Sequence, residues 1–254
     1  MDQLIQQAAQ LLAECRKLVV FTGAGISKES GIATFREAEE GVWERHDPHE
    51  LGTLQGFLRD PPLVWKWYQH RFGHITEVTT NPGHRAIAAL ERYVDRVVVI
   101  TQNIDNLHRE AGSSDIVELH GNYRFYKCLS GHKRFTTADF AEQGEIPPLC
   151  PRCGAMLRPD VVWFGEMLPP EALERAFAES SACDAMLVVG TSGTVQPAAS
   201  LPWEVRQAGG SIIEVNPNPS AITGLSNLFL QGPAGEVLPR VVDALATITT
   251  AGDG

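Results

Sequence analysis

Long apolar runs are absent from this chain of 254 residues. No stretch approaches the roughly 20 apolar residues that a helix needs to cross a membrane. The first residues also lack the basic segment and the apolar core of a signal peptide. We therefore expect no membrane association and a cytoplasmic location.

Positive charge is also scarce. Lys and Arg number 21 against 31 Asp and Glu, so the formal net charge is −10. Because nonspecific binding to nucleic acids depends on clustered Lys and Arg that neutralise phosphates, this balance argues against a nucleic-acid partner. It is compatible with the attraction of basic protein segments.

Cysteine is rare and unevenly distributed. The five cysteines occupy unpaired positions, which favours a reducing compartment. Cys15 and Cys183 lie at the edges of apolar segments, so we expect both to be buried as small hydrophobic residues. The other three, Cys128, Cys150 and Cys153, share one polar stretch.

The chain does contain a regular alternation of apolar strands and amphipathic helices. The expected strands are residues 17–22, 97–101, 185–190, 211–216 and 227–230. The expected helices are residues 2–14, 82–93, 170–180, 198–207 and 236–248. This alternation predicts an α/β fold with a doubly wound parallel sheet.

Two segments interrupt the alternation. Residues 38–80 contain three tryptophans but no clear strand, which predicts a helical module. Residues 123–158 contain three cysteines and many polar residues, which predicts a small β-rich insertion. We expect these segments to form a smaller inserted domain beside a Rossmann-like domain made of residues 1–37, 81–122 and 159–254.

Polar residues follow the apolar strand 97–101. Gln102, Asn103 and Asp105 bring amides and a carboxylate to the carboxyl end of this strand, where ligands bind in parallel sheets. His120 follows a short strand expected at residues 116–119 and can take a proton near neutral pH. Together with the glycine-rich segment after strand 17–22, these residues predict a nucleotide site with a built-in base.

The glycine-rich segment does not match the dehydrogenase fingerprint. It reads Gly23-x-Gly25-x-x-Lys28, so the third glycine is missing. No second strand ends in an acidic residue roughly 20 residues later. Hydride transfer is therefore disfavoured, although the glycines still allow backbone amides to face a phosphate, with Arg36 as a nearby cation.

Six motifs in order resemble those of the sirtuins, which are NAD-dependent protein deacylases. They are Gly23–Ser27, Gly31-Ile32, Thr34–Arg36, Thr101–Asp105, His120-Gly121 and Gly190–Ser192. The resemblance implies that NAD is the co-substrate, that acyl-lysine proteins or peptides are the partners, and that nicotinamide and O-acyl-ADP-ribose are products. It also implies that His120 is the general base and that Asn103 and Asp105 position the reacting groups.

The same resemblance implies the residues that contact NAD. They are Gly23, Ala24, Gly25, Ile26, Ser27, Thr34, Phe35, Arg36, Gln102, Asn103, Ile104, Asp105, Gly190, Thr191, Ser192, Asn216, Asn218 and Ala234. One position departs from the family pattern, because Glu37 follows Arg36 where sirtuins usually have glycine. This change predicts a stiffer and more acidic loop.

Tyr68 and Arg71 lie three residues apart, on one face of an expected helix. An aromatic hydroxyl beside a guanidinium can bind a carboxylate. The pair matches that of class III sirtuins, which implies removal of succinyl and malonyl groups as well as acetyl. The resemblance also implies that Val161, Phe164 and Gly165 belong to a strand that binds the substrate backbone.

Sirtuins usually carry a structural zinc on two C-x-x-C pairs in a zinc-ribbon-like segment. Here Cys150 and Cys153 form the second pair, but Cys128 is alone in the first, because Gly131 occupies the fourth position. His132 could complete a site with three cysteines and one histidine. Alternatively, the insertion folds around apolar side chains without a metal.

Two other functions remain open. One is protein mono-ADP-ribosylation from the same NAD site, and the other is a noncatalytic sensor of NAD or ADP-ribose. The presence of His120 with Tyr68 and Arg71 favours deacylation over ADP-ribosylation. Loss of His120, Asn103 or Asp105 would have favoured a sensor, and all three are present.

Overall fold

The computed structural model describes residues 1–32 and 51–252. Its central feature is a six-stranded sheet in the order β3-β2-β1-β6-β7-β8, with every neighbouring pair parallel. The strands are β1 (Lys17–Thr22), β2 (Arg96–Thr101), β3 (Ile116–Glu118), β6 (Ala185–Val189), β7 (Ser211–Asn216) and β8 (Leu228–Gln231). This order reverses direction between β1 and β6, so the predicted doubly wound, Rossmann-like sheet is confirmed.

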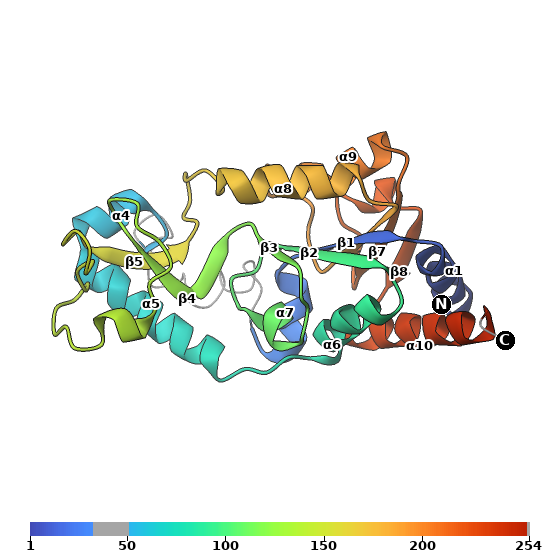
Figure 1. Cartoon of the computed structure of the whole chain (residues 1–254), viewed down its shortest axis with the longest axis horizontal. Coiled ribbons are helices and arrows are strands. Elements are labelled where there is room, and N and C mark those ends of the chain that lie inside the picture. Colours follow the sequence, from blue (N-terminus) through green and yellow to red (C-terminus); the bar gives the residue numbers. More distant parts are fainter. Residues whose placement is uncertain (33–50, 253–254) are drawn as a thin grey trace.

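Helices cover both faces of the sheet, as Figure 1 shows. They are α1 (Asp2–Ala13), α6 (Pro82–Ala89) and α10 (Ala234–Gly252) on one face, and α8 (Pro170–Ser181) and α9 (Leu201–Gln207) on the other. Leu18 and Val20 of β1 point into the first layer, whereas Val19 and Phe21 point into the second. Burial on both faces explains why these strands read as continuous apolar runs.

A smaller lobe lies beyond one end of the sheet (Figure 1). It contains α4 (Leu54–Arg59), α5 (Pro61–Thr76), the antiparallel pair β4 (Gly121–Cys128) and β5 (Leu157–Val161), and η4 (Thr137–Phe140). Trp65 of α5 packs against Tyr126 of β4, with ring centroids 5.2 Å apart. The expected helical and β-rich segments therefore share one aromatic core.

Short elements connect the larger ones. They are η1 (Ala24–Ser30), η3 (Leu90–Arg92), α7 (Leu107–Glu110), η5 (Ala198–Ser200) and η6 (Thr223–Leu225). In the described part of the chain, no helix has both the length and the apolar character needed to cross a membrane.

The expected strand around Val161 to Phe164 is only partly correct. β5 ends at Val161, and the residues that follow form a turn. The backbone amide of Trp163 donates to the Glu166 carboxylate over 2.9 Å, and Gly165 has a φ of +80°. The turn removes this segment from the β4–β5 ladder, which a continuous apolar run such as Val161 to Phe164 does not reveal.

Candidate active site

A cavity of about 430 Å³ lies between the carboxyl edge of the sheet and the smaller lobe. The sheet edge contributes Ala24, Ser27, Gln102, Asn103, Ile104, Asp105 and His120. The lobe contributes all five expected substrate residues, namely Tyr68, Arg71, Val161, Phe164 and Gly165. Residues that are far apart in the sequence and that carry different expected roles thus line one space.

The polar side chains at the sheet edge bond to one another. Ser27 Oγ donates to Asp105 Oδ2 over 2.6 Å, and Asn103 Nδ2 donates to Ser27 Oγ over 3.1 Å. The backbone amide of Leu107 donates to the other oxygen of Asp105. Burial raises the pKa of the Asp105 carboxyl, and the hydrogen bond from Ser27 opposes that rise. These contacts fix Asn103 and Asp105 before any ligand binds.

His120 has a defined tautomer. Its Nδ1 lies 2.7 Å from the carbonyl oxygen of Gln102. Because a carbonyl can only accept, Nδ1 carries the hydrogen and Nε2 keeps its lone pair. Burial lowers the pKa of His120, and the bond to the Gln102 carbonyl opposes that shift. The imidazole is therefore neutral at neutral pH and able to accept a proton at Nε2.

The carboxyl ends of β2, β6 and β7 are also joined. Gln102 Nε2 donates to Thr191 Oγ1 over 2.9 Å, and Asn216 Nδ2 donates to the Thr191 carbonyl over 2.8 Å. Thr191, Asn216 and Ala234 are buried. Ser192 bonds to Thr194, and Asn218 is exposed. These residues extend the polar edge of the sheet beyond the cavity, from β6 toward β7.

The glycines of this edge have a different use from the one we inferred. Gly23 N donates to Val189 O over 3.1 Å, and Gly25 N donates to Gly190 O over 2.8 Å. A Cβ on Gly25 would lie 2.7 Å from the Gly190 oxygen. The amides of Gly23 and Gly25 therefore do not face a phosphate. Glycine is needed because the loops after β1 and β6 touch.

Three expected cofactor residues, Thr34, Phe35 and Arg36, lie outside the described residues, as does Glu37. Sequence reasoning also missed two buried histidines behind Ser27. His84 Nε2 lies 3.5 Å from Ser27 Oγ, and His108 Nε2 lies 2.9 Å from Thr22 Oγ1. Burial lowers the pKa of His84 to about 4 and that of His108 to about 3. Both therefore stay neutral beside the site.

Tyr68 and Arg71 of α5 line the far end of the cavity. The Tyr68 hydroxyl accepts a hydrogen bond from Trp163 Nε1 over 2.7 Å, and burial raises its pKa to about 12. The Arg71 guanidinium lies 5.4 Å from the ring centre of Trp67. Among the residues that the structure describes, no carboxylate pairs with Arg71. This end of the cavity thus combines a partly buried cation with a neutral phenol.

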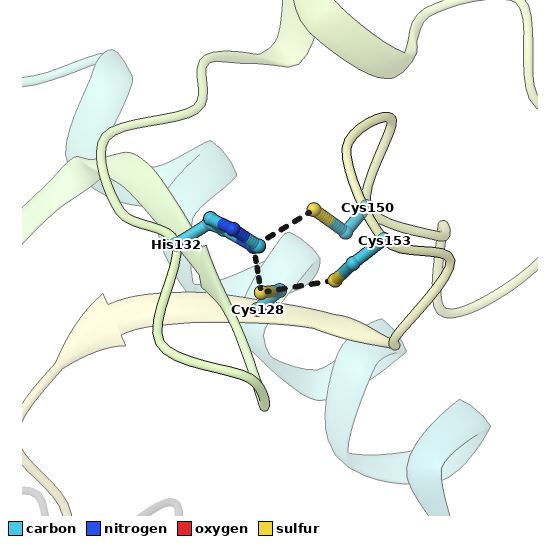
Figure 2. Close-up of side chains that lie close together, drawn as sticks. All are labelled: Cys128, His132, Cys150 and Cys153. Carbon is cyan, nitrogen blue, oxygen red and sulfur yellow. Dashed lines mark hydrogen bonds between the residues drawn. The ribbon is translucent and has the colours of Figure 1, made fainter.

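A cluster of three cysteines and one histidine lies in the smaller lobe, where β4 ends and β5 begins. Figure 2 shows Cys128, His132, Cys150 and Cys153 pointing toward one another, and their ligand atoms all lie within 4.8 Å of each other. Cys128 Sγ is 3.3 Å from His132 Nδ1 and 3.8 Å from Cys153 Sγ. Tetrahedral zinc with Zn–S bonds of about 2.3 Å separates its sulfurs by about 3.8 Å, so this donor set fits structural zinc.

The expected zinc-ribbon-like segment therefore has a complete set of four ligand atoms. His132 supplies the fourth through Nδ1. Gly131 adopts a φ of +93° in the turn that precedes His132. Apolar packing is present as well, because Phe135 is buried in the same core as Cys128 and Cys150. The segment thus contains both a donor set that fits zinc and an apolar core, and zinc binding itself stays a prediction.

Comparison with known proteins gives a consistent picture. The Sir2 family model matches residues 23–197. The NAD-dependent protein deacylase of Pyrococcus abyssi is 49% identical over 243 residues, which cover 94% of this chain and 97% of that protein.

Solved structures agree with the sequence comparisons. A Sir2 homologue in complex with NAD superposes with a TM-score of 0.85 at 45% identity, over 95% of this chain and 94% of that one. Sir2Af2 bound to a myristoylated histone peptide superposes with a TM-score of 0.78 at 38% identity, over 99% of this chain and all of that one (100%).

Proposed function

The chain belongs to the Sir2 family and is an NAD-dependent protein deacylase, and we propose that it removes succinyl and malonyl groups from lysine as well as acetyl groups. One observation carries the proposal. Arg71 and Tyr68 line the same cavity as His120, and Arg71 has no carboxylate partner among the described residues. Succinyl and malonyl groups end in a carboxylate, which needs such a partner when it is buried.

We propose that NAD lies along the carboxyl edge of the sheet, with its nicotinamide end in the cavity beside Asn103 and Asp105. Its adenosine end would lie toward Gly190–Ser192, Asn216, Asn218 and Ala234. The polar contacts that link Gln102, Thr191 and Asn216 support a single binding edge. When bound, NAD supplies the electrophilic ribose carbon from which nicotinamide leaves.

We propose that His120 acts as the general base. Its Nε2 accepts a proton from a ribose hydroxyl, while the Gln102 carbonyl holds the ring in the required tautomer. Asn103 and Asp105 are proposed to position the reacting groups, supported by their bonds to Ser27. Buried aromatic side chains at the lobe end help to keep water from the reacting atoms.

We propose that an acyl-lysine peptide binds along the segment from Val161 to Gly165. The amides of Val162 and Phe164 already donate to His120 O and Gly52 O. Among the described residues, the Val162 carbonyl and the Gly165 amide have no backbone partner and could bond to a peptide backbone. Main-chain recognition of this kind tolerates varied peptide sequences.

We also propose that the protein binds no nucleic acid, that it is cytoplasmic, and that its domains divide as the sequence predicts. The net charge of −10 supports the absence of a nucleic-acid partner. All five cysteines are free, which supports a cytoplasmic location. The division into residues 1–37, 81–122 and 159–254, with inserted segments 38–80 and 123–158, is supported by the separate sheet and lobe.

The test compares three peptides that differ only in the acyl group. The protein is incubated with NAD and with succinyl-, malonyl- or acetyl-lysine peptide, and both nicotinamide release and deacylated peptide are measured. We expect all three to react. Deacetylation without turnover of succinyl- and malonyl-lysine would overturn the proposed acyl range. Transfer of ADP-ribose to protein without deacylation would favour mono-ADP-ribosylation instead.

A further inference from the structure

The Tyr68 hydroxyl has one hydrogen-bond partner in the described structure, and it is a donor. Trp163 Nε1 lies 2.7 Å from the Tyr68 oxygen. An indole N–H can only donate, so the Tyr68 oxygen accepts. No described residue accepts the hydroxyl hydrogen, and the neighbouring Arg71 cannot do so because a guanidinium has no acceptor. The hydrogen of Tyr68 is therefore left for a ligand.

Trp163 itself is firmly held. Its side chain is buried, and the Arg158 guanidinium lies 3.4 Å from its ring centre. Arg158 pairs with Glu166, and Glu166 Oε2 accepts from the Trp163 backbone amide over 2.9 Å. Phe57 packs on the indole at a centroid distance of 5.3 Å. These contacts restrict rotation of the indole and keep its N–H on the Tyr68 oxygen.

The hydrogen bond from Trp163 influences whether the lobe end of the cavity offers donors or acceptors to a ligand. A free tyrosine hydroxyl can either donate or accept. With Trp163 as its donor, Tyr68 can offer its hydrogen while Arg71 offers N–H groups from the same helix. The pair thus directs donors from both side chains toward a ligand. It matches a carboxylate, which when ionised only accepts.

We propose that Trp163 is a positioning residue for acyl selectivity, whose indole N–H holds the Tyr68 hydroxyl as a donor toward the distal carboxylate of a succinyl or malonyl group. This inference rests on the proposed acyl range. Trp163 acts through Tyr68, and it is assigned no contact with the acyl carboxylate.

Trp163→Phe tests the inference, because it keeps an aromatic ring and removes the N–H. We expect the ratio of succinyl to acetyl kcat/KM to fall by about three- to tenfold, the effect of one lost hydrogen bond. The change should appear mainly in the KM for the succinyl peptide. An unchanged ratio would overturn the inference.

Trp65→Phe is the matched control. Trp65 is on the same helix as Tyr68, is 1% exposed, and lies outside the cavity lining. Its Nε1–H has no acceptor among the described residues. The same truncation therefore removes similar packing without removing a hydrogen bond, and the ratio should stay constant. An equal fall of the ratio in both variants would assign the effect of Trp163 to packing and overturn the inference.

A double-mutant cycle separates action through Tyr68 from direct action. In a Tyr68→Phe background, Trp163→Phe should lower the ratio no further. A full additional fall would overturn the inference. If Trp163→Phe does not fold, 3-benzothienylalanine at position 163 keeps the bicyclic shape and replaces the N–H with sulfur, and the same fall in the ratio is expected.

Arg71→Met separates failure of the role proposed for Arg71 from failure of the role proposed for Trp163. If it lowers succinyl and acetyl turnover equally, recognition of the acyl carboxylate by Arg71 fails, and the inference about Trp163 fails with it. If Arg71→Met lowers the ratio but Trp163→Phe does not, the inference alone fails.

Discussion

The two ends of the cavity differ in how their polar groups are satisfied. At the sheet edge, Ser27, Asn103 and Asp105 bond to one another, and His120 bonds to a backbone carbonyl. At the lobe end, Arg71 has no carboxylate partner among the described residues. A group that performs chemistry gains from geometry that is fixed in advance. A group that selects a substrate gains from an interaction that only the correct substrate completes.

This difference predicts separate effects of mutation. Changes at the sheet edge should lower turnover of every acyl substrate by a similar factor. Changes at the lobe end should lower turnover of acidic acyl substrates selectively. The following experiments test this division.

The largest effect is expected for His120→Ala. Because a general base contributes about 10²–10⁴-fold, kcat should fall by that factor for succinyl- and acetyl-lysine alike. NAD binding, measured by calorimetry, should persist, because the imidazole is not proposed to hold the cofactor. Residual activity within about twofold of the unmodified protein would contradict the role of His120.

Arg71→Met should produce a smaller and selective loss. A buried succinyl carboxylate would lose its charged partner, and hydrogen bonds to charged groups contribute about 1.5–3 kcal/mol. Succinyl kcat/KM should therefore fall by about one to two orders of magnitude, while acetyl kcat/KM changes much less. Steady-state kinetics on matched peptides measures both. Equal losses would mean that Arg71 supports the fold rather than the acyl group.

The sheet edge and the lobe end were not equally predictable from sequence. Gln102, Asn103 and Asp105 follow a buried strand directly, so their position at the sheet edge could be inferred from apolar pattern alone. The contact between Tyr68 and Trp163 joins residues 95 positions apart and depends on the turn that follows β5. Local periodicity carries no information about such a contact.

The histidines behind the site illustrate the same limit. His84 and His108 lie on short helices, where an isolated histidine has no distinctive spacing. Their proximity, with ring centroids 5.1 Å apart, arises only when α6 and α7 pack together. In contrast, the spacing of Cys150 and Cys153 indicated a metal site, and His132 was identifiable as a substitute ligand because of its place beside Gly131.

The cysteine cluster allows a test of whether the proposed zinc site and the NAD-binding cavity act independently. We expect one zinc per chain by elemental analysis, because four sulfur and nitrogen donors converge at zinc-like distances. His132→Ala should weaken retention of zinc during dialysis against a chelator and lower the melting temperature. NAD binding should change little, because the cluster contributes no residue to the cavity lining. Absence of zinc from the purified protein would contradict the assignment.

The smallest effect concerns pH and applies to both substrates. His120 accepts a proton only when neutral, so activity is present above its pKa and is lost as pH falls through that value. Burial lowers this pKa below the ordinary 6.5. An unperturbed histidine would be half protonated at pH 6.5, so its activity there would be about half of the plateau. We therefore expect kcat/KM at pH 6.5 to exceed half of its maximum, a difference of less than about twofold.

The acid limb of this profile should have the same midpoint for succinyl- and acetyl-lysine peptides. Tyr68 has a pKa of about 12 and remains neutral throughout the range, and Arg71 remains charged there, so neither changes its state near pH 6. A profile of kcat/KM from pH 5 to pH 8 on both peptides, with stability checked at each pH, measures the midpoint. A midpoint at or above 6.5 would contradict the neutral, buried state of His120. A midpoint that differs between the peptides would mean that the lobe end takes part in the proton chemistry, and the separation between chemistry and selectivity would fail.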